Sequence, residues 1–117
     1  LSVMTVNRKA FLDAIERAAL IILNDERRCP VQLFMNDSST TLTVAATTDC
    51  GTLREEVDAN LNGESIDIDF NTRYLIDALK NIDDESINIE FNGAQGPCII
   101  TPVEGEEFVY LILPIRR

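Results

Sequence analysis

The sequence contains no histidine, the side chain that most often acts as a general base near neutral pH. No serine or cysteine lies in a nucleophile motif either. Cys29, Cys50 and Cys98 are widely spaced, form no CxxC pair and make no zinc-binding pattern. We therefore expect neither catalysis nor a metal or cofactor, and we interpret the cysteines as free thiols in a reducing compartment.

Long apolar runs are missing as well. No stretch approaches the roughly 20 residues that a membrane-spanning helix needs, and no basic leader precedes an apolar segment. The expected location is cytoplasmic. Hydrophobic residues make up 45% of the 117-residue chain and charged residues 26%, which is typical of a folded protein. We expect one globular domain over residues 1–117.

Motifs for phosphate or hard cations are absent too. The stretch 93–97 contains glycines but lacks the pattern of a phosphate-binding loop, so we expect a hairpin loop there. Asp67 and Asp69 share one face of a predicted strand, and a second acidic cluster covers 83–85. Neither cluster has the spacing of a calcium loop, and solvated charge is the expected role of both.

The sequence does contain one order of elements written twice. Alternating and helical periodicities predict a strand, a helix and three strands, at 1–6, 7–22, 31–36, 40–47 and 52–59. Residues 60–63 are expected to close this half with a turn. The same order follows at 65–70, 71–81, 86–92, 97–102 and 107–113. A shift of 64 residues aligns Asn7 with Asn71 and Asp13 with Asp77, each asparagine being a predicted helix cap.

These elements predict an α+β fold made of a duplicated βαβββ unit, with repeats at about 1–60 and 64–117. Such a fold has eight antiparallel strands and two adjacent helices on one face. Alternation of apolar and acidic residues in SIDIDF and SINIEF agrees with sheets that have one solvated face. Chance similarity between two amphipathic helices is the alternative to duplication.

The formal net charge is −10, yet the two predicted helices carry more basic than acidic residues. Their basic residues are Arg8, Lys9, Arg17, Arg73 and Lys80. Two interpretations remain open. The helices are ordinary surface helices with pairs such as Arg73 and Asp77, or they form a weakly attractive, non-specific face for a polyanion, with acidic walls around it.

The most apolar run lies at the end of the sequence, where residues 108–117 read FVYLILPIRR. Its first part is expected to complete the second repeat as a strand. Pro114 then takes the chain out of the ladder, because proline has no N–H to donate.

Three stretches together give a resemblance to a known family: Phe70-Asn71-x-x-Tyr74, the closing Tyr110-Leu-Ile-Leu-Pro-Ile-Arg116, and the opening VNRKAFLDAIERA. The chain resembles the bacterial sliding clamp, the beta subunit of DNA polymerase III, over nearly its whole length. It corresponds to the third, C-terminal domain of that subunit. The resemblance implies a DNA-clamp fold, and because the chain begins at Leu1 we expect an excised domain.

The resemblance also implies partners. Two clamp subunits join head to tail into a homodimeric ring, and their helices surround duplex DNA. The five basic helix residues named above then become candidate contacts to phosphate. Short peptides of DNA polymerase and repair proteins bind the clamp, and a clamp loader and a second clamp subunit are further partners. The implied protein is a non-catalytic processivity factor of DNA replication.

The peptides of this family dock in a groove between the second and third domains. The positions implied for this chain's half of the groove are Asn71, Tyr74, Pro97, Leu111, Ile112, Leu113, Pro114, Ile115 and Arg116. We expect one alternating set of the tail to fill the core and the other to face the groove. Two departures from the family are the final Arg117 and Arg28, which stands where some relatives have an aromatic residue.

The leading hypothesis is therefore a sliding-clamp domain that forms one sector of a DNA ring and half of a peptide groove. An alternative is a stand-alone acidic protein-interaction domain with a clamp-like fold and no role at DNA. An enzyme is the least favoured of the three.

Overall fold

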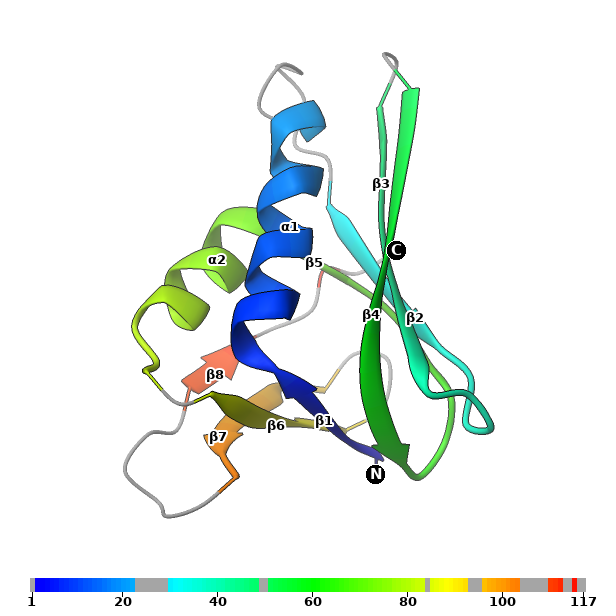
Figure 1. Cartoon of the computed structure of the whole chain (residues 1–117), viewed down its shortest axis with the longest axis vertical. Coiled ribbons are helices and arrows are strands. Elements are labelled where there is room, and N and C mark those ends of the chain that lie inside the picture. The colour runs from blue at the N-terminus through cyan, green and yellow to red at the C-terminus, as the bar shows by residue number, and fades with distance from the viewer. Residues whose placement is uncertain are drawn as a thin grey trace.

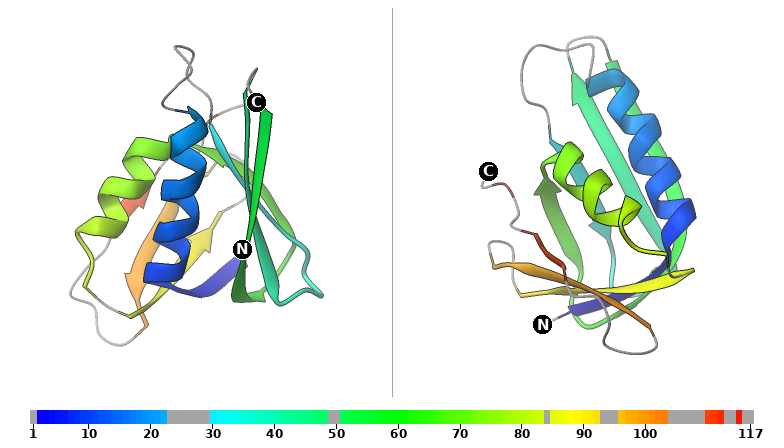
Figure 2. Two further views of the ribbon diagram at one scale, coloured as in Figure 1. Left: turned by 45° about the horizontal axis from the view of Figure 1, so that its top comes forward. Right: turned by 90° about the vertical axis from the view of Figure 1, so that its left-hand side faces the viewer.

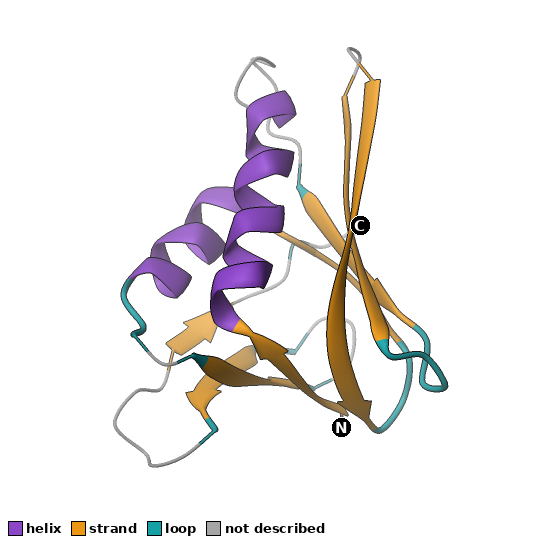
Figure 3. Ribbon diagram, in the orientation of Figure 1, coloured by secondary structure: helices purple, strands orange, loops and turns teal. Residues whose placement is uncertain are grey.

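The computed structural model describes residues 2–22, 30–48, 51–83, 85–92, 96–103, 110–112 and 115. Two helices and eight strands follow each other in the predicted order, strand, helix and three strands, twice over. Both helices lie on one side of the strands (Figures 1 and 3). The α+β fold with a duplicated βαβββ unit is confirmed.

The first repeat contains five elements. They are β1 (Ser2–Asn7), α1 (Arg8–Ile22), β2 (Val31–Met35), β3 (Thr41–Thr48) and β4 (Gly51–Asn62). Asn7 caps α1 as predicted, since its Oδ1 accepts a hydrogen bond from the Ala10 amide at 2.9 Å. The cap fixes the point at which the extended backbone of β1 turns into a helix.

Strand β4 is longer than the sequence predicts. The predicted closing turn includes Asn60 and Asn62, but both pair with β1, with Asn62 opposite Val3 and Asn60 opposite Thr5. The ladder of a neighbouring strand outweighs the low strand propensity of asparagine, which is a weak and context-dependent preference. The turn begins instead at Gly63, whose φ of 116° suits glycine.

The second repeat contains the equivalent elements. They are β5 (Ile66–Phe70), α2 (Thr72–Lys80), β6 (Ser86–Phe91), β7 (Cys98–Pro102) and β8 (Tyr110–Ile112). β6 and β7 pair antiparallel, and residues 93–95 of the predicted hairpin loop lie outside the described residues. Gly96 approaches the carbonyl of Asn92 so closely that a Cβ atom would collide with it. A glycine is needed there for close packing of the backbone.

The strands form one antiparallel sheet in the order β5-β2-β3-β4-β1-β6-β7-β8. If β5 and β8 at the two ends of this order are taken as neighbours, the strands form a cycle. In that cycle each strand of the first repeat has neighbours equivalent to those of its counterpart in the second repeat. One isolated antiparallel bridge joins the two ends, because the Ile115 amide donates to the Asp69 carbonyl at 2.8 Å. The sheet is therefore curled, and Ile115 lies beside the end of β5.

The core lies between the helices and the inner face of this sheet. Alternate strand residues are buried, with Met4 and Val6 in β1 and Ile87 and Ile89 in β6 among them. α1 packs on β3 and β4, α2 packs on β8, and the two helices contact each other (Figure 2). The predicted apolar stripe of α1 is confirmed where its side chains are described, at Phe11, Ile15 and Ala18, each with 0% exposure.

Candidate peptide groove and helix face

The first turn of α2 forms the best-defined part of the candidate groove. Asn71 precedes the helix in extended conformation, and its Oδ1 accepts a hydrogen bond from the Tyr74 amide at 3.1 Å. Tyr74 is 67% exposed, an unusual degree for a large aromatic side chain. Asn71 therefore sets the start of the helix, and Tyr74 offers an uncovered aromatic surface beside it.

The bridge at Ile115 brings the tail to this turn. Asp69, its partner, lies two residues before Asn71, so backbone from the end of the chain reaches the start of α2. The Ile115 side chain is 38% exposed. Asn71 and Ile115, two predicted groove residues far apart in the sequence, thus lie at one edge of the sheet.

Ile112 is a predicted groove residue, but the structure places its side chain in the core with 8% exposure. It pairs with Cys98, which is also buried. Since strand side chains alternate between faces, this burial agrees with the expectation that one set of the tail fills the core. In this structure the Ile112 side chain therefore belongs to the core.

Pro97 is exposed and immediately precedes β7. Its carbonyl accepts a hydrogen bond from the Asn92 side chain at 3.1 Å. Because Cys98 is opposite Ile112, Pro97 lies level with the point where the chain leaves β8. That position is compatible with the rim of the groove.

The other groove residues lie outside this description. Leu113, Pro114 and Arg116 are not among the described residues, and for Leu111 the structure describes the backbone in β8 but not the side chain. The two departures, Arg28 and Arg117, are also outside the described residues.

Three of the five basic helix residues are exposed and have no ion-pair partner among the described residues: Lys9, Arg73 and Lys80. Lys9 and Arg73 are equivalent in the two repeats, one residue after the first residue of each helix. Acidic neighbours are exposed beside them, including Asp13 and Asp77, which are also equivalent. The helix face therefore carries mixed charge, with cations at matching places in both repeats.

Arg8 and Arg17 are engaged within the chain. The Arg8 guanidinium donates to the Leu79 carbonyl at 3.2 Å, near the end of α2. Arg17 forms an ion pair with Glu55 of β4, with 2.6 Å between Nε and Oε1. These contacts tie α1 to α2 and to the sheet, so both residues have a structural role that sequence periodicity did not reveal.

The pair expected between Arg73 and Asp77 does not form. The ion pair of Arg17 and Glu55 is the one within 4.0 Å that the described part of the chain contains. Spacing on a helix permits an i,i+4 pair, but an exposed pair gains little and its side chains lose entropy. The example pair of the first interpretation is therefore absent, while both interpretations of the helix face stay predictions.

Two further residues near the candidate groove have features that the sequence did not indicate. Asp69 supplies the carbonyl that fastens the tail, although its sequence context indicated only solvated charge. Thr72 is 7% exposed, and its hydroxyl has no hydrogen-bond partner among the described residues. An unpartnered buried hydroxyl is costly, but no sequence pattern predicts it.

Cys98 is a free thiol with 1% exposure, and burial raises its pKa from 9.0 to about 12. The thiolate is the reactive form of cysteine, so this residue is inert near neutral pH. Cys29 and Cys50 lie outside the described residues. Within the described ranges, no group of three or more potential ligands is placed to hold a metal ion. Neither described helix is long and apolar enough to cross a membrane.

Comparison with solved structures identifies the class of protein. The DNA polymerase sliding clamp of Bacillus subtilis matches with a TM-score of 0.93 and 32% identity, over 99% of this chain and 30% of that chain. A putative DNA polymerase III beta subunit from Eubacterium rectale matches with a TM-score of 0.90 and 32% identity, over 99% of this chain and 30% of that chain. The fold is that of a sliding clamp.

The sequence comparisons identify the family. Residues 1–116 match the family model for the C-terminal domain of the DNA polymerase III beta subunit. The beta sliding clamp of Staphylococcus aureus is 36% identical over 114 residues, which are 97% of this chain and 30% of that protein. The chain belongs to this family of sliding-clamp C-terminal domains. It spans about 30% of the length of the curated relatives it matches.

Proposed function

We propose that this chain acts as the C-terminal domain of a sliding clamp, a non-catalytic processivity factor of DNA replication. It contributes one sector of a ring around duplex DNA and half of a groove for short peptides. Family membership supports the first part. The proposal of a peptide groove rests on the bridge between Asp69 and Ile115. This bridge brings the tail of the chain close to the start of α2, where Asn71 and Tyr74 lie.

The ring function requires weak, sequence-independent attraction to DNA. Phosphate contacts supply affinity without reading bases, and their strength grows with the number of cations. The helix face offers Lys9, Arg73 and Lys80, with Asp13 and Asp77 among them. Such a mixed face favours sliding, because a few dispersed cations attract the phosphates without holding the duplex in one register.

The groove function requires an apolar surface with a few orienting polar groups. Tyr74 and Ile115 offer exposed apolar area, and Asn71 adds an amide next to them. In this proposal, peptides of DNA polymerase and repair proteins bind here, with the clamp loader as a further partner. The remaining wall of the groove belongs to a preceding domain, and the ring is closed by a second copy of the full-length protein.

Peptide binding to the full-length protein tests the groove. Tyr74→Ala removes an exposed aromatic that packs on nothing in the core, so stability should stay within about 0.5 kcal/mol. Affinity for a clamp-binding peptide should fall roughly 10-fold or more, the cost expected of an aromatic anchor. Fluorescence anisotropy measures it. Asp77→Ala, one turn further along α2, is the matched control, and equal affinity of the two variants would refute the groove assignment.

The alternative of a stand-alone interaction domain without a role at DNA has no observation in its favour. An experiment separates it from the ring: the full-length protein should be retained on circular duplex DNA and released when that DNA is linearised. A stand-alone domain would show no difference between the two DNA forms, because only a ring is held by topology.

A further inference from the structure

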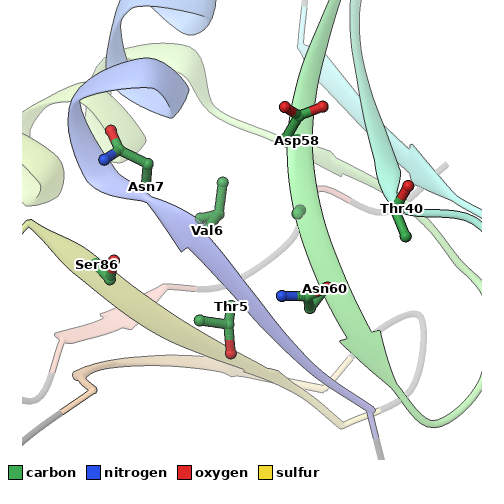
Figure 4. Close-up of a pocket in the computed structure, with 8 residues that line it drawn as sticks. Thr5, Val6, Asn7, Thr40, Asp58, Asn60 and Ser86 are labelled. Atoms are coloured by element: carbon green, nitrogen blue, oxygen red, sulfur yellow. The ribbon is translucent and has the colours of Figure 1, made fainter.

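A pocket lies where β4 changes its pairing partner. Up to Asp58 the strand pairs with β3, and from Ala59 it pairs with β1. The Ala59 amide still donates to the Thr40 carbonyl at 3.0 Å, so the two ladders meet at one residue. The hollow beside this junction has a volume of about 410 Å³ (Figure 4).

The wall of this junction pocket is polar. Its side chains with hydrogen-bonding groups are Thr5, Asn7, Thr40, Asp58, Asn60 and Ser86. They come from β1, β4, β6 and the residue before β3, and Asp58 and Asn60 project from alternate positions of β4 (Figure 4). Asp58 is the one charged residue in the wall. Within the described part of the chain its exposed carboxylate has no hydrogen-bond or ion-pair partner.

The internal repeat relates this pocket to the candidate groove. A shift of 64 residues aligns Thr5 with Asp69 and Asn7 with Asn71. The two asparagines are the helix caps. Thr5 pairs with Asn60, as Asp69 pairs with Ile115. In each repeat, we call the place where the strand before the helix pairs with the last segment of that repeat a corner. The junction pocket lies at the corner of the first repeat, and the candidate groove lies at the corner of the second.

The two corners differ in chemistry. At the second corner the crossing segment presents Ile115, whereas at the first it presents Asn60 next to Asp58. The first corner thus suits a polar, positively charged group and repels an apolar one. The net charge of −10 strengthens the attraction for a cation over long distances.

We propose that the junction pocket is a second docking site, which takes an arginine side chain from an extended segment of a partner protein. A guanidinium is planar and has five N–H donors, so it can bind the Asp58 carboxylate with two hydrogen bonds. Its remaining donors can reach the amide oxygen of Asn60, which lies next to Asp58 on the same face of β4. A lysine ammonium lacks this fork and fits less well.

The experiment uses the whole chain, labelled with ¹⁵N, and the peptide acetyl-Gly-Arg-Gly-amide as the probe. Titration followed by ¹H–¹⁵N spectra should shift the amide and side-chain signals of Asn7 and Asn60 and saturate in the millimolar range. The same peptide with citrulline in place of arginine keeps the shape but loses the charge. It should produce much smaller shifts at the same signals.

Two variants locate the carboxylate. Asp58→Asn should weaken arginine-peptide binding about fivefold, the upper range for an exposed ion pair. Glu56→Gln removes the same charge from the same face of β4, two residues away and outside the pocket, and should leave binding unchanged. Preserved spectra away from the pocket establish that each variant is folded.

Equal effects of the two variants would overturn the proposal, because they would indicate general attraction to an acidic surface. Equal binding of the arginine and citrulline peptides would overturn it as well, and this comparison needs no variant. The proposal does not depend on the proposed clamp function. Loss of peptide binding at Tyr74 and loss at Asp58 are measured with different probes, so either can fail alone.

Discussion

Replacing Asn71 with alanine removes the side chain that caps α2. The lost interaction is one hydrogen bond, from the Tyr74 amide to Oδ1, with a length of 3.1 Å. Helix caps of this kind contribute about 1 kcal/mol. For 117 residues such a loss corresponds to a fall in Tm of roughly 4 °C. Thermal unfolding followed by circular dichroism measures it.

The internal repeat provides a matched control for this substitution. Asn7 makes the same cap bond to Ala10 at 2.9 Å, so Asn7→Ala should lower Tm by a similar amount. Asn71→Asp keeps an acceptor oxygen and should retain most of the stability. An Asn71→Asp variant as unstable as Asn71→Ala, or no change at Asn7, would refute the assignment of these residues as caps.

The same pair of variants separates stability from binding. In the full-length protein, Asn71→Ala should also weaken binding of a clamp-binding peptide, because Asn71 belongs to the candidate groove. Asn7→Ala should leave that affinity unchanged, since its cap lies at the other corner. If both variants lose affinity equally, the loss reflects general destabilisation, and the role of Asn71 in the groove is wrong.

Two further predictions concern the buried thiol and the helix face. The pKa of Cys98 is raised from 9.0 to about 12 in the folded chain, so the unfolded chain loses this proton first as pH rises. Cys98 therefore makes stability fall above pH 9, by about 1 kcal/mol at pH 10, and urea unfolding of Cys98→Ala should show a shallower decline over that interval. A decline that is the same in both proteins would contradict this. In the full-length protein, Arg73→Gln should lower the slope of log affinity for duplex DNA against log salt by about 0.9. Arg17→Gln should leave this slope unchanged, because Arg17 is paired with Glu55. A lower slope for Arg17→Gln and an unchanged slope for Arg73→Gln would contradict the assignment of Arg73 as the phosphate contact.

Local patterns were sufficient to predict the elements and the repeat. Both asparagine caps and the buried stripe of α1 follow from side-chain chemistry within a few residues, and the structure has them where expected. Strand positions followed from alternation in the same way. The short range of these determinants explains why one sequence was enough.

Contacts between distant residues could not be predicted in this way. The pair of Arg17 and Glu55 joins residues 38 positions apart, and Arg8 reaches the carbonyl of Leu79, 71 positions away. The packing of α1 against α2 and against β4 decides these contacts, and periodicity along the sequence does not contain that packing. The same limit explains why the sequence groups Arg17 with the unpaired cations and places Asn60 in a turn.

The two repeats differ in the side chains that they present at equivalent places, where the strand before each helix meets the last segment of the repeat. At the first corner a ladder of four residue pairs, Val3 to Val6 opposite Ala59 to Asn62, joins β1 to β4. At the second corner the described residues contain a single bridge, from Asp69 to Ile115. The second corner carries the exposed side chains of Tyr74 and Ile115, which is the apolar surface that the proposed peptide groove needs. At the first corner, the ladder between β1 and β4 holds the backbone that carries Thr5 and Asn60, so these walls of the polar pocket are fixed by the sheet.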